Sequence, residues 1–243
     1  IGWCLIVMRW STTGIRMFWA GLLLGCLLVS VCADTVYVSS SGSDSNICSE
    51  TSPCLTLARA VEAASGASVV DIVLLSDLDS ALTGNHGVIV PPGLTFGLSS
   101  APSISAHIYS STVVSSSIIA INGYASVSIV NLQVTVSSLS IDPIFSIHNA
   151  SNVNITNCAF HGYAADVIGS RLVIDNSQFI GSPSFGANSS AMSFLGFDMN
   201  ATVIINACSF IGYVGSTFGA LRLGSVSLPI LSAVVKGSLF ANN

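Results

Sequence analysis

One eight-residue pattern recurs five times in the second half of the chain and constrains the fold more than any other feature. Apolar and polar residues alternate through most of each copy, which is the period of a β-strand. The third position is always Ile or Val, and the last is Val or Phe. The copies are VSIVNLQV (127–134), VNITNCAF (153–160), LVIDNSQF (172–179), VIINACSF (203–210) and AVVKGSLF (233–240).

The spacing of these copies predicts a solenoid. Their last residues are 26, 19, 31 and 30 residues apart, which is about one coil each. A coil cannot bury its inward residues alone, but coils stacked at about 4.8 Å bury them against each other and align like residues in ladders. We therefore expect an aliphatic and an aromatic interior ladder, which are Ile129, Ile155, Ile174, Ile205 and Val235, and Phe160, Phe179, Phe210 and Phe240.

A β-sandwich is the competing fold, because short strands and frequent turns also suit it. A sandwich does not require aligned copies of one motif, whereas a solenoid does. The repeat therefore favours an all-β fold with a single parallel β-helix.

The first 33 residues have the pattern of a secretory signal peptide. Arg9 and Arg16 precede an uncharged apolar run at 18–31, and small residues follow up to Ala33. The run is shorter than the roughly 20 residues of a membrane-spanning helix. We expect cleavage after about Ala33 and a secreted or cell-surface protein; the alternative is an uncleaved signal anchor.

Residues 34–66 differ from the coils at 67–243 and resemble a cap. Alternating Val36 and Val38 indicate a short strand, and apolar residues at helical spacing in 56–64 indicate a helix. The first long strand is VVDIVLL (69–75). A strand and helix placed before the first coil would cover the open edge of the stack.

The chain resembles secreted right-handed parallel β-helix proteins of the pectin-lyase-like superfamily in the segment YVSSSGSDSN…SPCLTLARAV (37–61). Its coils also resemble the repeats of chlamydial polymorphic outer-membrane proteins. FANN (240–243) matches their Phe-x-x-Asn motif, and FGAL (218–221) and FGAN (185–188) are degenerate forms of their Gly-Gly-Ala-aliphatic motif. The second resemblance implies surface adhesion, and we expect further coils after residue 243.

Charge excludes one class of partner. After residue 33 the chain carries 11 carboxylates and only four cations, Arg59, Arg171, Arg222 and Lys236. Nucleic-acid binding needs clustered Lys and Arg, so we expect no nucleic-acid partner. Glycans or cell-surface proteins are the expected partners. Membrane association would come only from a C-terminal region beyond this sequence or from an uncleaved signal.

Four cysteines remain after residue 33. Cys48 and Cys54 flank a short loop and are expected to form a disulfide, which secretion permits. Cys158 and Cys208 share one repeat position, but the intervening copy has Ser177 there. Two steps of about 4.8 Å exceed the ~7 Å limit between bridged Cα atoms, so these two cysteines should not pair with each other.

The sequence also has four N-glycosylation sequons. An Asn- and Ser-rich chain can form sequons by chance, but a secreted chain would expose them to glycosylation. The acceptors are Asn149, Asn154, Asn188 and Asn200.

No catalytic, cofactor or metal site is predicted. Glycoside hydrolysis needs two carboxylates on one groove, and the acids after residue 125 do not share repeat positions. Asp77 and Asp79 could hold a cation, but acids are common in polar loops. His107 and His148 are interpreted as polar strand positions. The Asn at repeat position five, in Asn131, Asn157 and Asn176, predicts a structural amide ladder at a turn.

We therefore expect a non-catalytic structural or adhesive module outside the cell. The alternative is a polysaccharide lyase or glycoside hydrolase on the same fold.

Overall fold

The computed structural model describes residues 33–110, 112, 116–123, 126–135, 142–181, 190–196, 200–213, 220–225 and 232–243. Apart from Ala33, the predicted signal segment lies outside this range. Among the described residues, no helix combines the length and the apolar character needed to cross a membrane.

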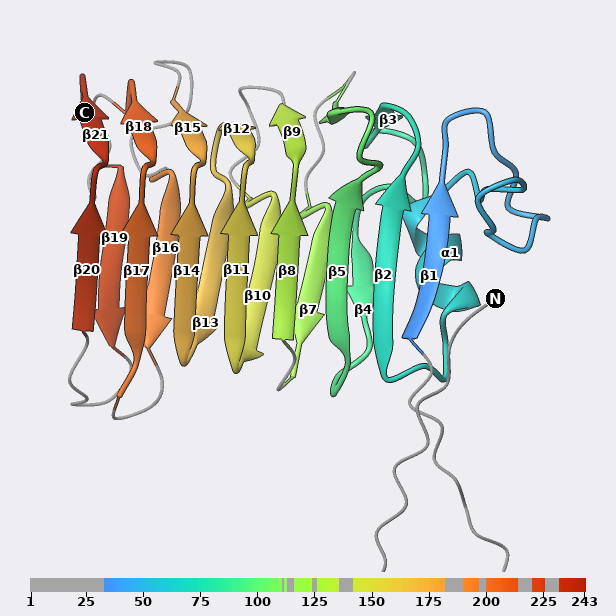
Figure 1. Ribbon diagram of the computed structural model, residues 1–243, viewed down its shortest axis with the longest axis horizontal. Coiled ribbons are helices and arrows are strands. Elements are labelled where there is room, and N and C mark those ends of the chain that lie inside the picture. Colours follow the sequence, from blue (N-terminus) through green and yellow to red (C-terminus); the bar gives the residue numbers. More distant parts are fainter. Residues whose placement is uncertain are drawn as a thin grey trace, which may run out of the picture. The chain divides into compact units, whose positions relative to one another are not determined.

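These residues form a right-handed parallel β-helix, as the repeat predicts. Three sheets run along the stack, and every strand pair within them is parallel. The chain rises through the eight-stranded sheet, continues through the seven-stranded sheet and returns through the six-stranded sheet behind (Figure 1). It advances by one coil each time it returns to the eight-stranded sheet.

The eight-stranded sheet receives one strand from every coil, from the first to the last. Its strands, in spatial order, are β1 (Ala33–Val38), β2 (Val69–Leu74), β5 (Thr95–Ser100), β8 (Ser126–Val130), β11 (Asn152–Thr156), β14 (Arg171–Asp175), β17 (Thr202–Asn206) and β20 (Ser232–Lys236).

The other two sheets follow the same order along the stack. The seven-stranded sheet comprises β3 (Leu78–Asp79), β6 (Ala106–Tyr109), β9 (Leu132–Thr135), β12 (Ala159–His161), β15 (Gln178–Ile180), β18 (Ser209–Ile211) and β21 (Leu239–Ala241). The six-stranded sheet comprises β4 (Val88–Val90), β7 (Ile119–Asn122), β10 (Phe145–Ala150), β13 (Ala165–Gly169), β16 (Met192–Gly196) and β19 (Leu221–Ser225).

Each copy of the repeat folds as two strands rather than one. Its first half lies in the eight-stranded sheet and its second half in the seven-stranded sheet, with a bend at position five. The bend residue has a left-handed backbone in every copy, with φ of 56° at Asn131, 54° at Asn157, 47° at Asn176, 50° at Ala207 and 57° at Gly237. Asn and Gly tolerate this conformation best, which explains their prevalence at the bend.

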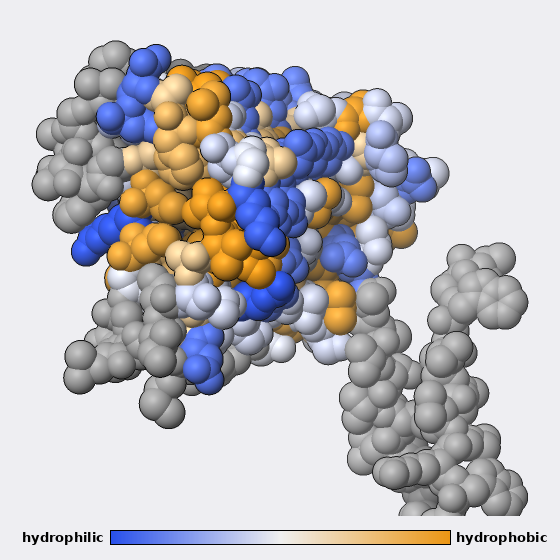
Figure 2. All heavy atoms as spheres, turned by 60° about the vertical axis from the view of Figure 1, so that its left-hand side comes forward, coloured by the Kyte–Doolittle hydropathy of each residue, from blue (hydrophilic) through white to orange (hydrophobic). Residues whose placement is uncertain are grey.

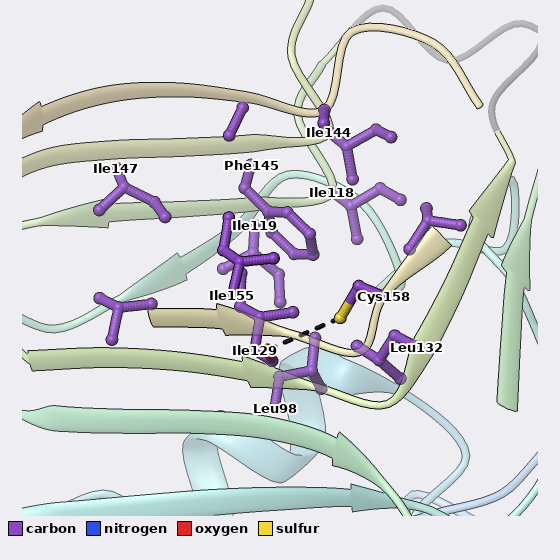
Figure 3. Packing of buried hydrophobic residues seen from close by; sticks show 14 of the residues in the cluster. Leu98, Ile118, Ile119, Ile129, Leu132, Ile144, Phe145, Ile147, Ile155 and Cys158 are labelled. Carbon is purple, nitrogen blue, oxygen red and sulfur yellow. Dashed lines mark hydrogen bonds between the residues drawn. The ribbon is translucent and has the colours of Figure 1, made fainter. Parts of the chain in front are cut away.

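The two predicted ladders run through the interior, beside the inward-facing residues of the six-stranded sheet. Ile129, Ile155, Ile174, Ile205 and Val235 occupy equivalent positions on neighbouring strands. The four ladder phenylalanines are also in register, and their ring centroids lie 5.3, 4.7 and 4.8 Å apart in succession. Figure 3 shows Ile129, Ile155 and Phe145 directed into the same interior. Burial of these side chains is the main stabilising contribution to the stack.

The N-terminal end of the stack is closed. The helix α1 (Leu57–Ala63) buries Leu57 and Ala60 against it, and Thr56 caps the helix by accepting a hydrogen bond from the Arg59 backbone N–H at 3.2 Å. The loop at 48–54 covers β1, because Tyr37 N–H donates to the Cys48 carbonyl at 2.8 Å and Cys54 N–H donates to the Tyr37 carbonyl at 2.9 Å. This arrangement satisfies backbone groups that an edge strand would expose.

The C-terminal coil has no such cover among the described residues. Val235 and Phe240 are 46% and 45% exposed, whereas Ile205 and Phe210 at the same positions one coil earlier are fully buried. Figure 2, which brings this end of the molecule forward, shows apolar side chains gathered on the surface. A side chain at the same ladder position therefore contributes less to stability in the last coil than in the interior.

Replacement of Phe179 by Ala should lower the free energy of unfolding by about 3–5 kcal/mol, because the substitution leaves a cavity between two stacked rings. Phe240→Ala should cost roughly half as much or less, since 45% of this side chain is already exposed. Urea unfolding followed by circular dichroism measures both losses. Equal losses would contradict the position of these residues in the stack.

Replacement of Ala207 by Gly or Asn should stabilise the protein by about 1 kcal/mol, because a left-handed backbone is costly for alanine. The control is Ala159→Gly in strand β12, which should lower stability by about 0.5–1 kcal/mol. Thermal unfolding distinguishes the two cases. A loss of stability at both positions would show that the bend is not strained at Ala207.

Candidate functional site

The outer face of the six-stranded sheet brings together the polar groups best suited to bind a ligand. Side chains alternate along a strand, so every second residue of β10, β13, β16 and β19 points outward. One outward row consists of Ser146, Asp166, Ser193 and Arg222, which lie opposite one another on successive strands. The sheet thus places a carboxylate, hydroxyls and a guanidinium on consecutive coils.

His148 lies beside this row. Its Nε2 is 3.7 Å from Asp166 Oδ2 and 3.4 Å from Ser146 Oγ. The side chains of His148 and Asp166 are 36% and 31% exposed, so solvent weakens the interaction between them. The imidazole and the carboxylate remain accessible to a ligand.

Tyr163 precedes β13 and adds a phenol to the cluster. Burial and the negative charge of Asp166 raise its pKa to about 12, while Arg222 and a hydrogen bond with Ser193 partly oppose this shift. The phenol therefore stays protonated near neutral pH. It can donate a hydrogen bond but is a poor general base.

We call His148, Tyr163, Asp166, Ser193 and Arg222 the outer-face cluster. Sequence reasoning missed it. His148 was interpreted as an isolated polar strand position, which is correct for its place on β10 but overlooks Asp166. The strands of this sheet alternate inward and outward residues, but no residue type recurs at one position to align them. Their sequences are FSIHNA, ADVIG, MSFLG and LRLGS. Each of these strands follows the two strands formed by one copy of the repeat. Only this place in the coil sets their register, and with it the position of the cluster.

The acids and histidines considered as metal ligands have local structural partners. Asp77 Oδ1 accepts the His107 backbone N–H at 2.8 Å, and Asp79 Oδ1 accepts the Ala81 N–H at 2.9 Å. His107 Nε2 lies 3.0 Å from Thr135 Oγ1. Within the described part of the chain, no group of three or more His, Cys, Asp or Glu is placed to hold a metal ion.

The cysteines follow the predicted pattern. Cys48 and Cys54 form a disulfide, while Cys158 and Cys208 are free and buried. Ser177 lies between the two free cysteines, and its hydroxyl accepts the Cys158 backbone N–H at 3.2 Å. Figure 3 shows the Cys158 sulfur directed to the Ile129 carbonyl, 3.6 Å away. Burial raises the pKa of the Cys158 thiol to about 11 and also raises that of Cys208.

Three of the four predicted glycosylation acceptors lie within the described residues. Asn149 and Asn200 are exposed, and Asn154 is half-buried on the outer face of β11. Asn188 falls outside this range, as do Phe185 and Phe218 of the degenerate motifs.

Known proteins offer little guidance. No family model matches the chain, and no curated protein matches it. A solved structure of a rhamnogalacturonan lyase aligns with 86% of this chain and 67% of its own length, at 16% identity and a TM-score of 0.30. This alignment is too weak to support an inference, so the fold assignment rests on the parallel sheets themselves.

Cys158 and Cys208 should resist alkylation in the folded protein, because buried thiols of raised pKa hold little reactive thiolate. Both should react once the protein is unfolded in denaturant. Peptide mass spectrometry after each treatment measures the labelling. A linked Cys158–Cys208 peptide would contradict the register of the coils.

Proposed function

We propose that the protein is a non-catalytic, extracellular adhesive module that binds glycans through the outer-face cluster. The observation that carries this proposal is the alignment of Asp166, Ser193 and Arg222 on three successive strands. Asp166 and Arg222 remain accessible two strands apart, at about 4.8 Å per strand, so that one sugar chain can reach both. Ser193 between them is buried at 4% exposure and hydrogen-bonds to Tyr163, so it holds that phenol in place. Rigid strands also hold the side chains in position before the ligand arrives, which favours binding.

The chemistry of the cluster favours binding over hydrolysis. It contains one carboxylate, Asp166, whereas glycoside hydrolysis uses a pair. The protonated phenol of Tyr163 can donate a hydrogen bond to a sugar oxygen. The guanidinium of Arg222 can donate to hydroxyls or to the carboxylate of a uronic acid.

The proposed location outside the cell rests on the signal-like segment before Asp34 and on the disulfide between Cys48 and Cys54. Disulfides persist in oxidising compartments. Glycans on Asn149, Asn154 and Asn200 would be compatible with the fold, since none of these side chains points into the interior.

A polysaccharide lyase is the second candidate, because His148 and Arg222 share the outer face with Asp166. An imidazole can abstract the proton next to a uronate carboxylate, and an arginine can neutralise that carboxylate. This reaction leaves an unsaturated product that absorbs ultraviolet light, so it is easily distinguished from binding.

The test presents the protein with pectins, alginate and neutral plant glycans and measures both binding and chain cleavage. Adhesion predicts binding without cleavage. Arg222→Ala should weaken binding roughly tenfold or more, since a hydrogen bond to a charged group is worth about 1.5–3 kcal/mol.

The matched control is Arg171→Ala, which removes an exposed arginine from the eight-stranded sheet and should leave affinity unchanged. Chain cleavage that disappears in His148→Ala would establish the lyase instead. Loss of binding in the Arg171 variant would mean that only overall charge matters.

A further inference from the structure

A second polar surface follows the bend between the eight-stranded and seven-stranded sheets. It is a shallow groove of about 370 Å³, which is within the size range of small-ligand sites. Its lining comes from equivalent positions on successive coils, namely Ser105, Asn131, Leu132, Gln133, Asn157, Cys158, Ala159, Asn176, Ser177, Gln178, Ala207 and Ser209. We call this surface the amide groove, since side-chain amides predominate among its polar groups.

One wall of the amide groove is the asparagine ladder. Asn157 donates from Nδ2 to Asn131 Oδ1 at 3.0 Å, and Asn176 donates to Asn157 Oδ1 at 3.1 Å. An amide nitrogen has two N–H groups. Asn157 and Asn176 are exposed and each use one N–H in the ladder, so the other remains for a ligand. The ladder also fixes the direction of these donors.

Two glutamines also line the amide groove. Gln133 and Gln178 are the only two glutamines in the sequence, and both line this groove two coils apart. Among the described residues, neither side-chain amide has a hydrogen-bond partner. Gln178 is exposed and Gln133 half-buried. The asparagines are explained by the strained bend, but the glutamines are not.

We propose that the amide groove binds a neutral polysaccharide chain lying along the axis of the stack. No charged residue lines the groove, so it offers nothing to pair with a uronate or a sulfate. Amide groups donate and accept at once, which suits the hydroxyls of a neutral sugar. Coils spaced about 4.8 Å apart would bring successive sugars to Asn131, Asn157 and Asn176 in turn. The glutamines would meet every second sugar, because Ala159 occupies the coil between them.

A glycan fits this surface better than a peptide does. An extended peptide gains affinity by pairing its backbone with a free sheet edge. The strands beside the groove are internal members of their sheets, so their backbone groups are already paired. Only side chains are available. This site lies at the junction of the eight- and seven-stranded sheets, whereas the outer-face cluster lies on the six-stranded sheet, so it does not depend on the function proposed there.

The two glutamines make a direct test possible. Labelling the whole protein with glutamine carrying ¹⁵N in its side-chain amide yields NMR signals from Gln133 and Gln178 alone. Titration with cellohexaose, mannohexaose and laminarihexaose should shift both pairs of signals with at least one of these sugars. The double variant Gln133→Ala/Gln178→Ala should weaken that binding by on the order of tenfold, as expected for the loss of two neutral hydrogen bonds.

The matched control is Ser128→Ala/Thr202→Ala, which removes two half-buried hydroxyls from the outer face of the eight-stranded sheet. It should leave the affinity unchanged. Unaltered thermal unfolding of the glutamine variant separates a binding role from a structural one. Unshifted glutamine signals with all three sugars, equal affinity in the glutamine variant, or signals that respond only to an extended peptide would each overturn the proposal.

Discussion

The stacking of like side chains inside the coils is the interaction on which the rest of the structure depends. The phenylalanine rings from 179 to 240 lie nearly parallel, with interplanar angles of 4° and 6°. Such stacks require each coil to keep the register of the one before it. The outward rows inherit that register, so the inner ladders also set the positions of Asp166, Ser193 and Arg222. The geometry of a surface site in this fold therefore depends on how well the interior side chains hold the coils in register.

The parts of the fold that could be read from the sequence are those where one residue type recurs. Phe at position eight and Ile at position three identify the interior, because only an aligned stack explains their repetition. Asn at position five indicates the bend, because Asn tolerates a left-handed backbone. The helix after Thr56 was predictable from the helical spacing of its apolar residues.

The outer-face cluster was not predictable in the same way. An outward position can accept Ser146, Asp166, Ser193 or Arg222 with little effect on packing, so no repeated residue type reveals the row. His148 and Asp166 also lie on different strands and meet diagonally rather than at equivalent positions. The conformation of Ala207 was also not predictable. Alanine does not favour a left-handed backbone, so its sequence position gives no indication of the conformation that the neighbouring coils impose on it.

The unequal spacing of the repeats has a consequence for how such a chain can change. Ladder residues are separated by as few as 19 and as many as 31 residues, yet they occupy identical places in the stack. Doubling the length of a flexible loop costs only about 0.6 kcal/mol in closure entropy. That is less than the contribution of a single buried phenylalanine. Insertions and deletions in the loops between strands can therefore change the surface of the molecule without disturbing the packing of its interior ladders.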